Sequence, residues 1–341
     1  MATMRDVARR AGVSTASVSH VINQTRPVSG ELRQKVLAAM QELEFRPNRL
    51  ASGLRSGHSK TLGMIMPDSD NPFFAEVARG AEEASSRWGL SVILCNSKGD
   101  AGIELMYVGL LIEKQVDGIL FFAAGVSGER LMAALRASCV PMVVTDRESM
   151  EVSADFLGID NVAGGRLATK HLLDLGHRRI ACIAGPSDHT PSAGRVIGYR
   201  QMLQECGVPG DEELVVKGDW RSGGGRRATL GLLTLPDPPT AIFACNDMMA
   251  VGAISAAAGQ GLRVPEDISV VGFDNIELAS FTVPALTTIN QPKHEVGSTA
   301  VAMLMDRIKA PALPSRRLIF PLELIVRKSS GPARKEELPM T

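Results

Sequence analysis

From Thr61 onward, short apolar runs of β-type composition alternate with stretches of helical periodicity, and this alternation constrains the fold more than any other feature. The expected strands are Leu62–Met66, Val92–Cys95, Ile119–Phe122, Met142–Thr145, Ile180–Ala184, Ala241–Cys245 and Val270–Phe273. The amphipathic stretches between them include Phe73–Trp88, Glu104–Gln115, Gly164–Leu175 and Met248–Gly259. Apolar strands that alternate with helices predict an α/β fold of doubly wound parallel sheets, each buried on both faces. The number of such elements over about 270 residues predicts two lobes.

The charge distribution separates the first 60 residues from the rest of the chain. The whole chain carries 37 basic and 37 acidic residues, so its formal net charge is zero. Residues 1–60 nevertheless carry ten Lys or Arg residues against four acids, a net charge of +6, and the remainder carries −6. A basic head on an acidic body predicts a polyanion partner for the head. The alternative interpretation is an ordinary solvated charged surface.

Composition and motifs exclude several classes of protein. The chain has no apolar run of about 18 residues, and its first residues contain no apolar segment, so we expect neither a membrane span nor a secretory signal. Five scattered cysteines without a CxxC pair fit a reducing cytoplasm. Walker, GxGxxG, GxSxG and HExxH motifs are missing. We therefore expect a cytoplasmic protein that is no enzyme and holds no cofactor or metal.

The basic head has the pattern of three short helices. Thr3, Ser14 and Ser29 each precede an apolar stripe of helical spacing and are the expected N-caps. Gly12 supplies the tight turn between the first two helices, as in a helix-turn-helix, whose second helix enters the DNA major groove. The outward residues of that helix are short and polar: Thr15, Ala16, Ser17, Ser19 and His20. An inert three-helix bundle is the alternative.

The spacing of small and apolar residues in the head also carries a resemblance. The run that contains Asp6-Val7-Ala8, Ala11-Gly12-Val13-Ser14, Val18-Ser19 and Val21-Ile22-Asn23 resembles the DNA-binding head of the lactose-repressor family. That resemblance implies that the segment after Arg46 is a hinge helix, which inserts Leu54 into the minor groove as a wedge. The other candidate DNA-contacting residues are Arg26, Asn48 and Arg55.

Polar and aromatic side chains follow the expected strands of the body, where doubly wound sheets bind ligands. The candidate ligand-binding residues are Asn71, Phe73, Phe74, Asp146, Arg147, Arg195, Trp220, Asn246, Asp274 and Gln291. The aromatic rings suit the C–H face of a sugar, and the carboxylate, guanidinium and amide groups suit its hydroxyls. Each residue also has a structural alternative, because Asn71 is a good helix cap before a proline and the two phenylalanines suit a core.

These residues extend the resemblance to the body. They match the periplasmic sugar-binding fold of the lactose-repressor family, and the stretches Val92–Asp100 and Ile276–Phe281 are similar to its ribose-responsive members. The resemblance implies a homodimeric repressor that a monosaccharide, with ribose expected, releases from a palindromic operator. Purine-responsive members carry arginine and threonine where this chain has His189 and Pro191. A purine or another sugar as corepressor remains the alternative, and a secreted transport protein is a weaker one.

The resemblance also sets the expected domain boundaries. The head takes residues 1–46, and the hinge helix and linker take residues 47–60. One lobe of the body takes residues 61–161 with 291–320, and the other takes 162–290 with 321–341. The polar tail after Ser329 shows no leucine heptad, so we expect a dimer and no tetramer.

Overall fold

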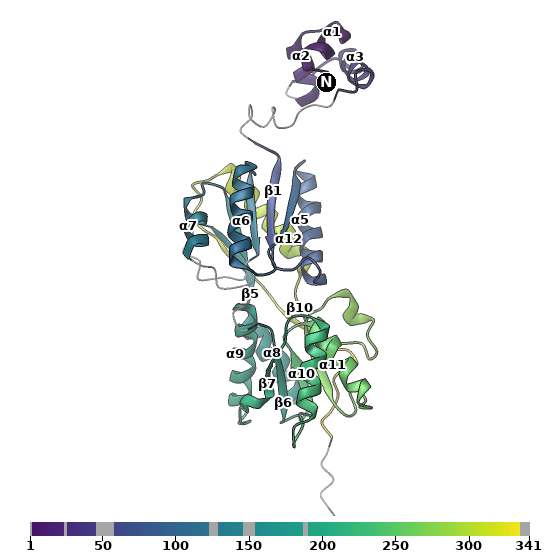
Figure 1. Ribbon diagram of the computed structural model, residues 1–341, viewed down its shortest axis with the longest axis vertical. Coiled ribbons are helices and arrows are strands. Elements are labelled where there is room, and N and C mark those ends of the chain that lie inside the picture. Colours follow the sequence, from purple (N-terminus) through teal and green to yellow (C-terminus); the bar gives the residue numbers. More distant parts are fainter. Residues whose placement is uncertain are drawn as a thin grey trace, which may run out of the picture. The chain divides into compact units, whose positions relative to one another are not determined.

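The computed structural model describes residues 2–23, 26–45, 58–122, 129–145, 154–186 and 190–334. The chain divides into two compact units, a head at Met1–Ser59 and a body at Lys60–Thr341 (Figure 1). The expected hinge residues Asn48, Leu54 and Arg55 lie outside the described residues, as do the ligand-binding candidates Asp146 and Arg147. Over the described ranges, no helix combines the length and apolarity needed to span a bilayer.

The described part of the head forms three helices, which are α1 (Met4–Ala11), α2 (Thr15–Asn23) and α3 (Gly30–Glu42). Thr3 and Asp6 cap α1 reciprocally, because the Asp6 amide donates to the Thr3 hydroxyl at 3.3 Å and the Thr3 amide donates to the Asp6 carboxylate at 2.9 Å. Gly12 ends α1 in the left-handed region at φ 66°. The small core consists of Val7, Ala8, Val18, Val21, Val36 and Ala39. These helices confirm the expected helix-turn-helix arrangement.

The described residues of the body form two six-stranded sheets. In spatial order, the first sheet consists of β11 (Arg317–Phe320), β5 (Asp155–Ile159), β4 (Met142–Thr145), β3 (Gly118–Phe122), β1 (Thr61–Met66) and β2 (Ser91–Asn96), all parallel. The second consists of β12 (Glu323–Ile325), β10 (Thr287–Asn290), β9 (Ser269–Asp274), β8 (Ala241–Ala244), β6 (Ile180–Ala184) and β7 (Val215–Lys217), where β12 alone is antiparallel. We call the two halves of the body the N-lobe and the C-lobe after these sheets.

Helices cover both faces of each sheet, as the doubly wound pattern predicts (Figure 1). The N-lobe carries α5 (Pro72–Arg87) and α12 (Lys293–Lys309) on one face and α6 (Ala101–Glu113) and α7 (Glu129–Ala137) on the other. The C-lobe pairs α8 (Asn161–Asp174) with α9 (Thr190–Glu205), and α10 (Ser222–Leu233) with α11 (Asp247–Gly259). Short 3-10 turns lie at Glu212–Leu214 (η1) and Glu277–Ser280 (η2). Alternate residues of β3 separate the two cores, since Leu120 faces α5 and α12 while Phe121 faces α6 and α7.

In the described part of the chain, three segments cross between the lobes. The chain passes from β5 to α8, from β10 to α12, and from β11 to β12. Neither lobe is therefore one continuous piece of sequence.

One expectation about these elements is wrong. The run Val92–Cys95 was expected to be buried on both faces, but β2 is an edge strand, and Ile93 and Leu94 remain 38% and 45% exposed. Helix α10 begins at Ser222, so Gly223, Gly224 and Gly225 lie in its first turn. A Cβ on Gly225 would overlap the carbonyl of Met249, so this glycine allows α10 and α11 to pack backbone to backbone.

Candidate functional site

A cavity of about 430 Å³ lies within the body and is lined by residues of both lobes. Among its lining residues are all the ligand-binding candidates that the structure describes, namely Asn71, Phe73, Phe74, Arg195, Trp220, Asn246, Asp274 and Gln291. They converge because the carboxyl ends of parallel strands meet at one edge of each sheet. The two remaining candidates, Asp146 and Arg147, follow β4 and lie outside the described residues.

The N-lobe wall of the cavity is the beginning of α5. Asn71 caps this helix, because its side-chain oxygen accepts a hydrogen bond from the Phe73 amide at 3.0 Å. Phe73 and Phe74 meet edge to face with ring centroids 5.0 Å apart. Asn71 therefore both caps α5 and lines the cavity, and Phe73 is both buried in the core and part of the cavity wall. The result is a wall with two aromatic rings and one amide.

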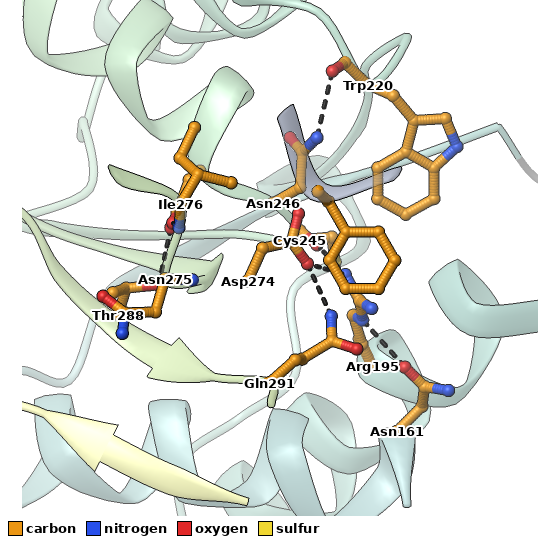
Figure 2. A network of polar contacts seen from close by, with 12 residues as sticks. Asn161, Arg195, Trp220, Cys245, Asn246, Asp274, Asn275, Ile276, Thr288 and Gln291 are labelled. Carbon is orange, nitrogen blue, oxygen red and sulfur yellow. Dashed lines mark hydrogen bonds and ion pairs between the residues drawn. The ribbon is translucent and has the colours of Figure 1, made fainter. Parts of the chain in front are cut away.

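The C-lobe wall is organised around Arg195, which is buried in the second turn of α9 (Figure 2). Helix α9 begins at Thr190, so Arg195 lies within a helix and its backbone position is rigid. Its guanidinium donates to the Asn161 side chain at 2.9 Å and to the Cys245 carbonyl, and it stacks 3.7 Å from the centroid of the Phe273 ring. These contacts fix the plane of the guanidinium inside the cavity.

Asp274 is the acidic partner of Arg195, and Nη1 of the arginine lies 3.5 Å from Oδ1 of the carboxylate. The Gln291 amide donates to the same oxygen at 2.6 Å (Figure 2). Asp274 and the following Asn275 both have left-handed backbones, with φ of 113° and 51°. Such backbone conformations are uncommon outside glycine and tend to occur at functional sites.

Trp220 and Asn246 form the third part of the C-lobe wall. Trp220 has a positive φ of 65°, and its ring centroid lies 5.7 Å from the Arg195 guanidinium. The Asn246 amide donates to the Trp220 carbonyl at 3.0 Å, and its oxygen accepts from the Met249 amide at 2.9 Å, which caps α11. Asn246 thus connects the backbone of Trp220 to the beginning of α11.

Asp247 lies behind the cavity and does not cap α11, which Asn246 does. Its carboxyl accepts from the Ile276 amide at 2.8 Å and contacts the Thr288 hydroxyl at 2.5 Å. Burial, together with the nearby charge of Asp274, raises the pKa of Asp247 to about 8. It supports the turn that presents Asp274.

Several charged and polar residues of the cavity were not predicted from the sequence, namely Asp68, Asp70, Asn96, Lys98 and Arg221. Arg221 of the C-lobe reaches Asp68 of the N-lobe at 3.2 Å. Asn96 ends β2, so the strand-end criterion would have found it. Across the described ranges, no group of three or more His, Cys, Asp or Glu residues has the arrangement of a metal site.

Most candidate DNA-contacting residues that the structure describes in the head lie at the beginning of α2. Thr15 and Ala16 are exposed, and Ser17, Ser19 and His20 are partly buried. Ser14 caps the helix by accepting from the Ser17 amide at 3.1 Å, and the two hydroxyls lie 2.9 Å apart. Arg26, beyond the helix, is exposed.

Comparisons with known proteins assign the family. Residues 3–48 match the model for bacterial regulatory proteins of the lacI family, and residues 169–330 match a periplasmic binding protein-like domain. The ribose operon repressor of Escherichia coli (strain K12) is 43% identical over 318 residues, which cover 93% of this chain and 96% of the relative. The chain belongs to the LacI family.

Other relatives agree with this assignment. The transcriptional repressor PurR of Photobacterium profundum is 41% identical over 329 residues, 96% of this chain and 98% of its own. A lac repressor dimer bound to operator and the anti-inducer ONPF has a TM-score of 0.87 at 31% identity, covering 97% and 99% of the two chains. A LacI-family regulator from Enterococcus faecium with bound ribose has a TM-score of 0.73 at 32% identity, covering 80% and 100%. This LacI-family protein is a DNA-binding transcriptional repressor and no enzyme.

Proposed function

We propose that this repressor responds to ribose, which binds in the cavity and releases the protein from its operator. The observation that carries the proposal is the donor and acceptor set of the cavity. Arg195, Asp274 and Gln291 form one connected cluster, and the rings of Phe73 and Phe74 stand on the N-lobe wall. A buried polyhydroxyl ligand needs this combination, because every polar group that it leaves unpaired costs free energy.

The residues that distinguish a sugar from a purine also support ribose. Pro191 lines the cavity, and the family resemblance implies a threonine at this position in purine-responsive members, so this chain lacks that hydroxyl. One relative is named the ribose operon repressor, and the similar E. faecium regulator holds bound ribose. The similarity to PurR favours a purine corepressor as the second candidate.

Release from DNA follows from differential binding to two conformations of the body. A ligand shifts this equilibrium only if it binds the DNA-incompetent form more tightly. The cavity takes residues from both lobes, so a ligand that fills it selects one lobe arrangement. In this proposal residues 1–46 read the operator through the beginning of α2, and the hinge at 47–60, with Asn48, Leu54 and Arg55, carries the change to the DNA.

We further propose a homodimer that binds a palindromic operator. The edge strand β2 exposes Ile93 and Leu94, and the C-lobe exposes Phe281 by 72% and Val283 by 92%. Apolar side chains of this size suit an interface, and the similar lac repressor is a dimer on its operator. Sedimentation of the full chain tests this: a dimer is expected, and a monomer at micromolar concentration would contradict it.

Calorimetry of the full-length protein tests the ligand. Ribose, other pentoses, hexoses, hypoxanthine and guanine are titrated separately, and saturable binding of ribose is expected. Gel-shift titration with an operator fragment then gives the sign, with ribose expected to weaken DNA binding. Saturable binding of a purine with no response to any sugar would instead establish the second candidate.

A further inference from the structure

Lys293 is a buried lysine beside the cavity, and the described lining residues do not include it. It is the first residue of α12 and only 6% exposed. Its ammonium donates hydrogen bonds to the carbonyls of Asp274 at 2.9 Å, Asn275 at 2.7 Å and Gln291 at 3.3 Å. Burying an ammonium is costly unless its donors are satisfied, so this arrangement indicates a specific role.

The carbonyls that Lys293 binds belong to the part of the backbone that presents the ligand-binding groups. Asp274 and Gln291 both line the cavity, and Asp274 and Asn275 form the left-handed turn. Left-handed residues other than glycine persist only where surrounding contacts hold them, because this backbone conformation is unfavourable for a residue with a Cβ. The Lys293 ammonium therefore stabilises the turn through the carbonyls of Asp274 and Asn275.

The backbone of Lys293 belongs to α12 of the N-lobe, whereas the turn that its ammonium binds belongs to the C-lobe. Gly80 of α5 faces the His294 carbonyl so closely that a Cβ there would overlap it, and Gly297 of α12 faces the Val77 carbonyl in the same way. Helix α12 is therefore locked onto α5, whose beginning forms the aromatic wall of the cavity. Lys293 connects this helix pair of the N-lobe to the Asp274 turn of the C-lobe.

We propose that Lys293 is a positioning residue for the effector, which holds Asp274 and Gln291 in register with the aromatic wall formed by α5. This inference rests on the proposed ligand-binding role of the cavity. Burial has the largest effect on the Lys293 ammonium and lowers its pKa, whereas the carboxylates of Glu76 in α5, Asp274 and Asp247 act in the opposite direction and Arg327 lowers the pKa further. The lysine acts through Asp274 and Gln291 and makes no ligand contact itself.

The test replaces the ammonium while keeping the volume of the side chain. Lys293→Met removes every donor, and Lys293→Gln keeps two. Calorimetry should show that ribose binding weakens at least tenfold in Lys293→Met and less in Lys293→Gln. The matched control is Lys309→Met at the far end of the same helix, where the exposed ammonium lies 4.0 Å from the Trp88 ring. This control should bind ribose as the wild type does, and equal affinity in all variants would overturn the proposal.

A double-mutant cycle separates positioning from a general structural effect. If Lys293 acts through the Asp274–Gln291 pair, Lys293→Met should weaken ribose binding at least threefold less in a Gln291→Ala background than in the wild type. Equal factors in both backgrounds would show that the lysine is merely structural. If the wild type binds a purine in place of ribose, the proposed function fails and the same cycle is run with that purine.

A measurement without ligand keeps the proposal falsifiable in every case. Amide hydrogen exchange of the peptide that contains Asn275 and Ile276 should accelerate in Lys293→Met and, to a smaller extent, in Lys293→Gln. Exchange of the same peptide in Lys309→Met should not change. Unchanged protection in both Lys293 variants would overturn the proposal.

Discussion

Replacement of Arg195 by methionine tests the centre of the cavity. Methionine keeps most of the apolar stem of the side chain and removes the guanidinium. The Asn161 side chain and the Cys245 carbonyl then lose a donor, and Asp274 loses its ion-pair partner. Removal of one partner from a buried pair costs about 3–5 kcal/mol of stability. We expect a loss of about 3 kcal/mol, at the low end, because the pair is 3.5 Å apart and Asp274 keeps its bond to Gln291.

The same substitution should weaken ligand binding by a separate mechanism. A hydroxyl that loses a charged donor in a closed site costs about 2 kcal/mol, which corresponds to about a 30-fold increase in Kd for ribose. Urea unfolding at constant m-value measures the first effect, and calorimetry measures the second.

Arg166→Met is the matched control for this substitution. Arg166 pairs with Glu205 on the surface of the same lobe, with an N–O distance of 2.7 Å and roughly a third of its side chain exposed. Surface pairs contribute about 0–1 kcal/mol, so the control should change stability by no more than that and leave ribose binding intact. If Arg195→Met were no more costly than Arg166→Met and bound ribose equally well, the assignment of Arg195 to the site would be refuted.

Further predictions concern packing, pH and salt. Gly80→Ala places a methyl group against the His294 carbonyl and should lower the free energy of unfolding in urea by about 2–3 kcal/mol. The control Gly109→Ala adds a methyl group in open space on α6 and should stabilise the protein. Equal effects of the two substitutions would refute the packing argument. Because folding raises the pKa of Asp247 from 3.8 to about 8, the folded state binds more protons than the unfolded state in that window, and the free energy of unfolding should fall as pH rises through it. Asp247→Asn should flatten this slope, and an unchanged slope would contradict the raised pKa. A plot of the logarithm of operator affinity against the logarithm of salt concentration should have a slope of about −0.9 per neutralised phosphate, and Arg55→Ala should reduce the size of that slope by about 1.8 per dimer. An operator affinity that does not depend on salt would contradict the DNA-binding role of the basic head.

The sequence predicted the parts of the site that depend on topology alone. Asn71, Asn246 and Asp274 were found because they follow buried parallel strands, and any doubly wound sheet brings such positions together. Arg195 was found for the same reason, although its place in a helix was not, since a segment with few apolar residues gives a weak helical signal. Helix caps such as Thr3 and Ser29 were found because capping is a local interaction.

The parts that were missed depend on long-range geometry. The ion pair between Asp68 and Arg221 exists only because the lobes face each other in one orientation, which no local pattern encodes. The left-handed backbone of Trp220 and Asp274 opposes their intrinsic preference and is imposed by surrounding contacts. Burial of Lys293 against carbonyls is equally invisible in sequence, where a lysine at the start of a helix indicates a solvated surface.

The three crossings between the lobes also determine the order in which the molecule is completed during synthesis. The head is encoded before residue 60, whereas both sheets of the body wait for one nine-residue segment, Arg317–Ile325, that supplies β11 to one and β12 to the other. At about 5–20 residues per second, the ribosome needs about 15–55 s after the head before the body is complete. A nascent chain therefore carries a helix-turn-helix for most of its synthesis without any effector cavity, and the two lobes become complete almost simultaneously at the end of translation.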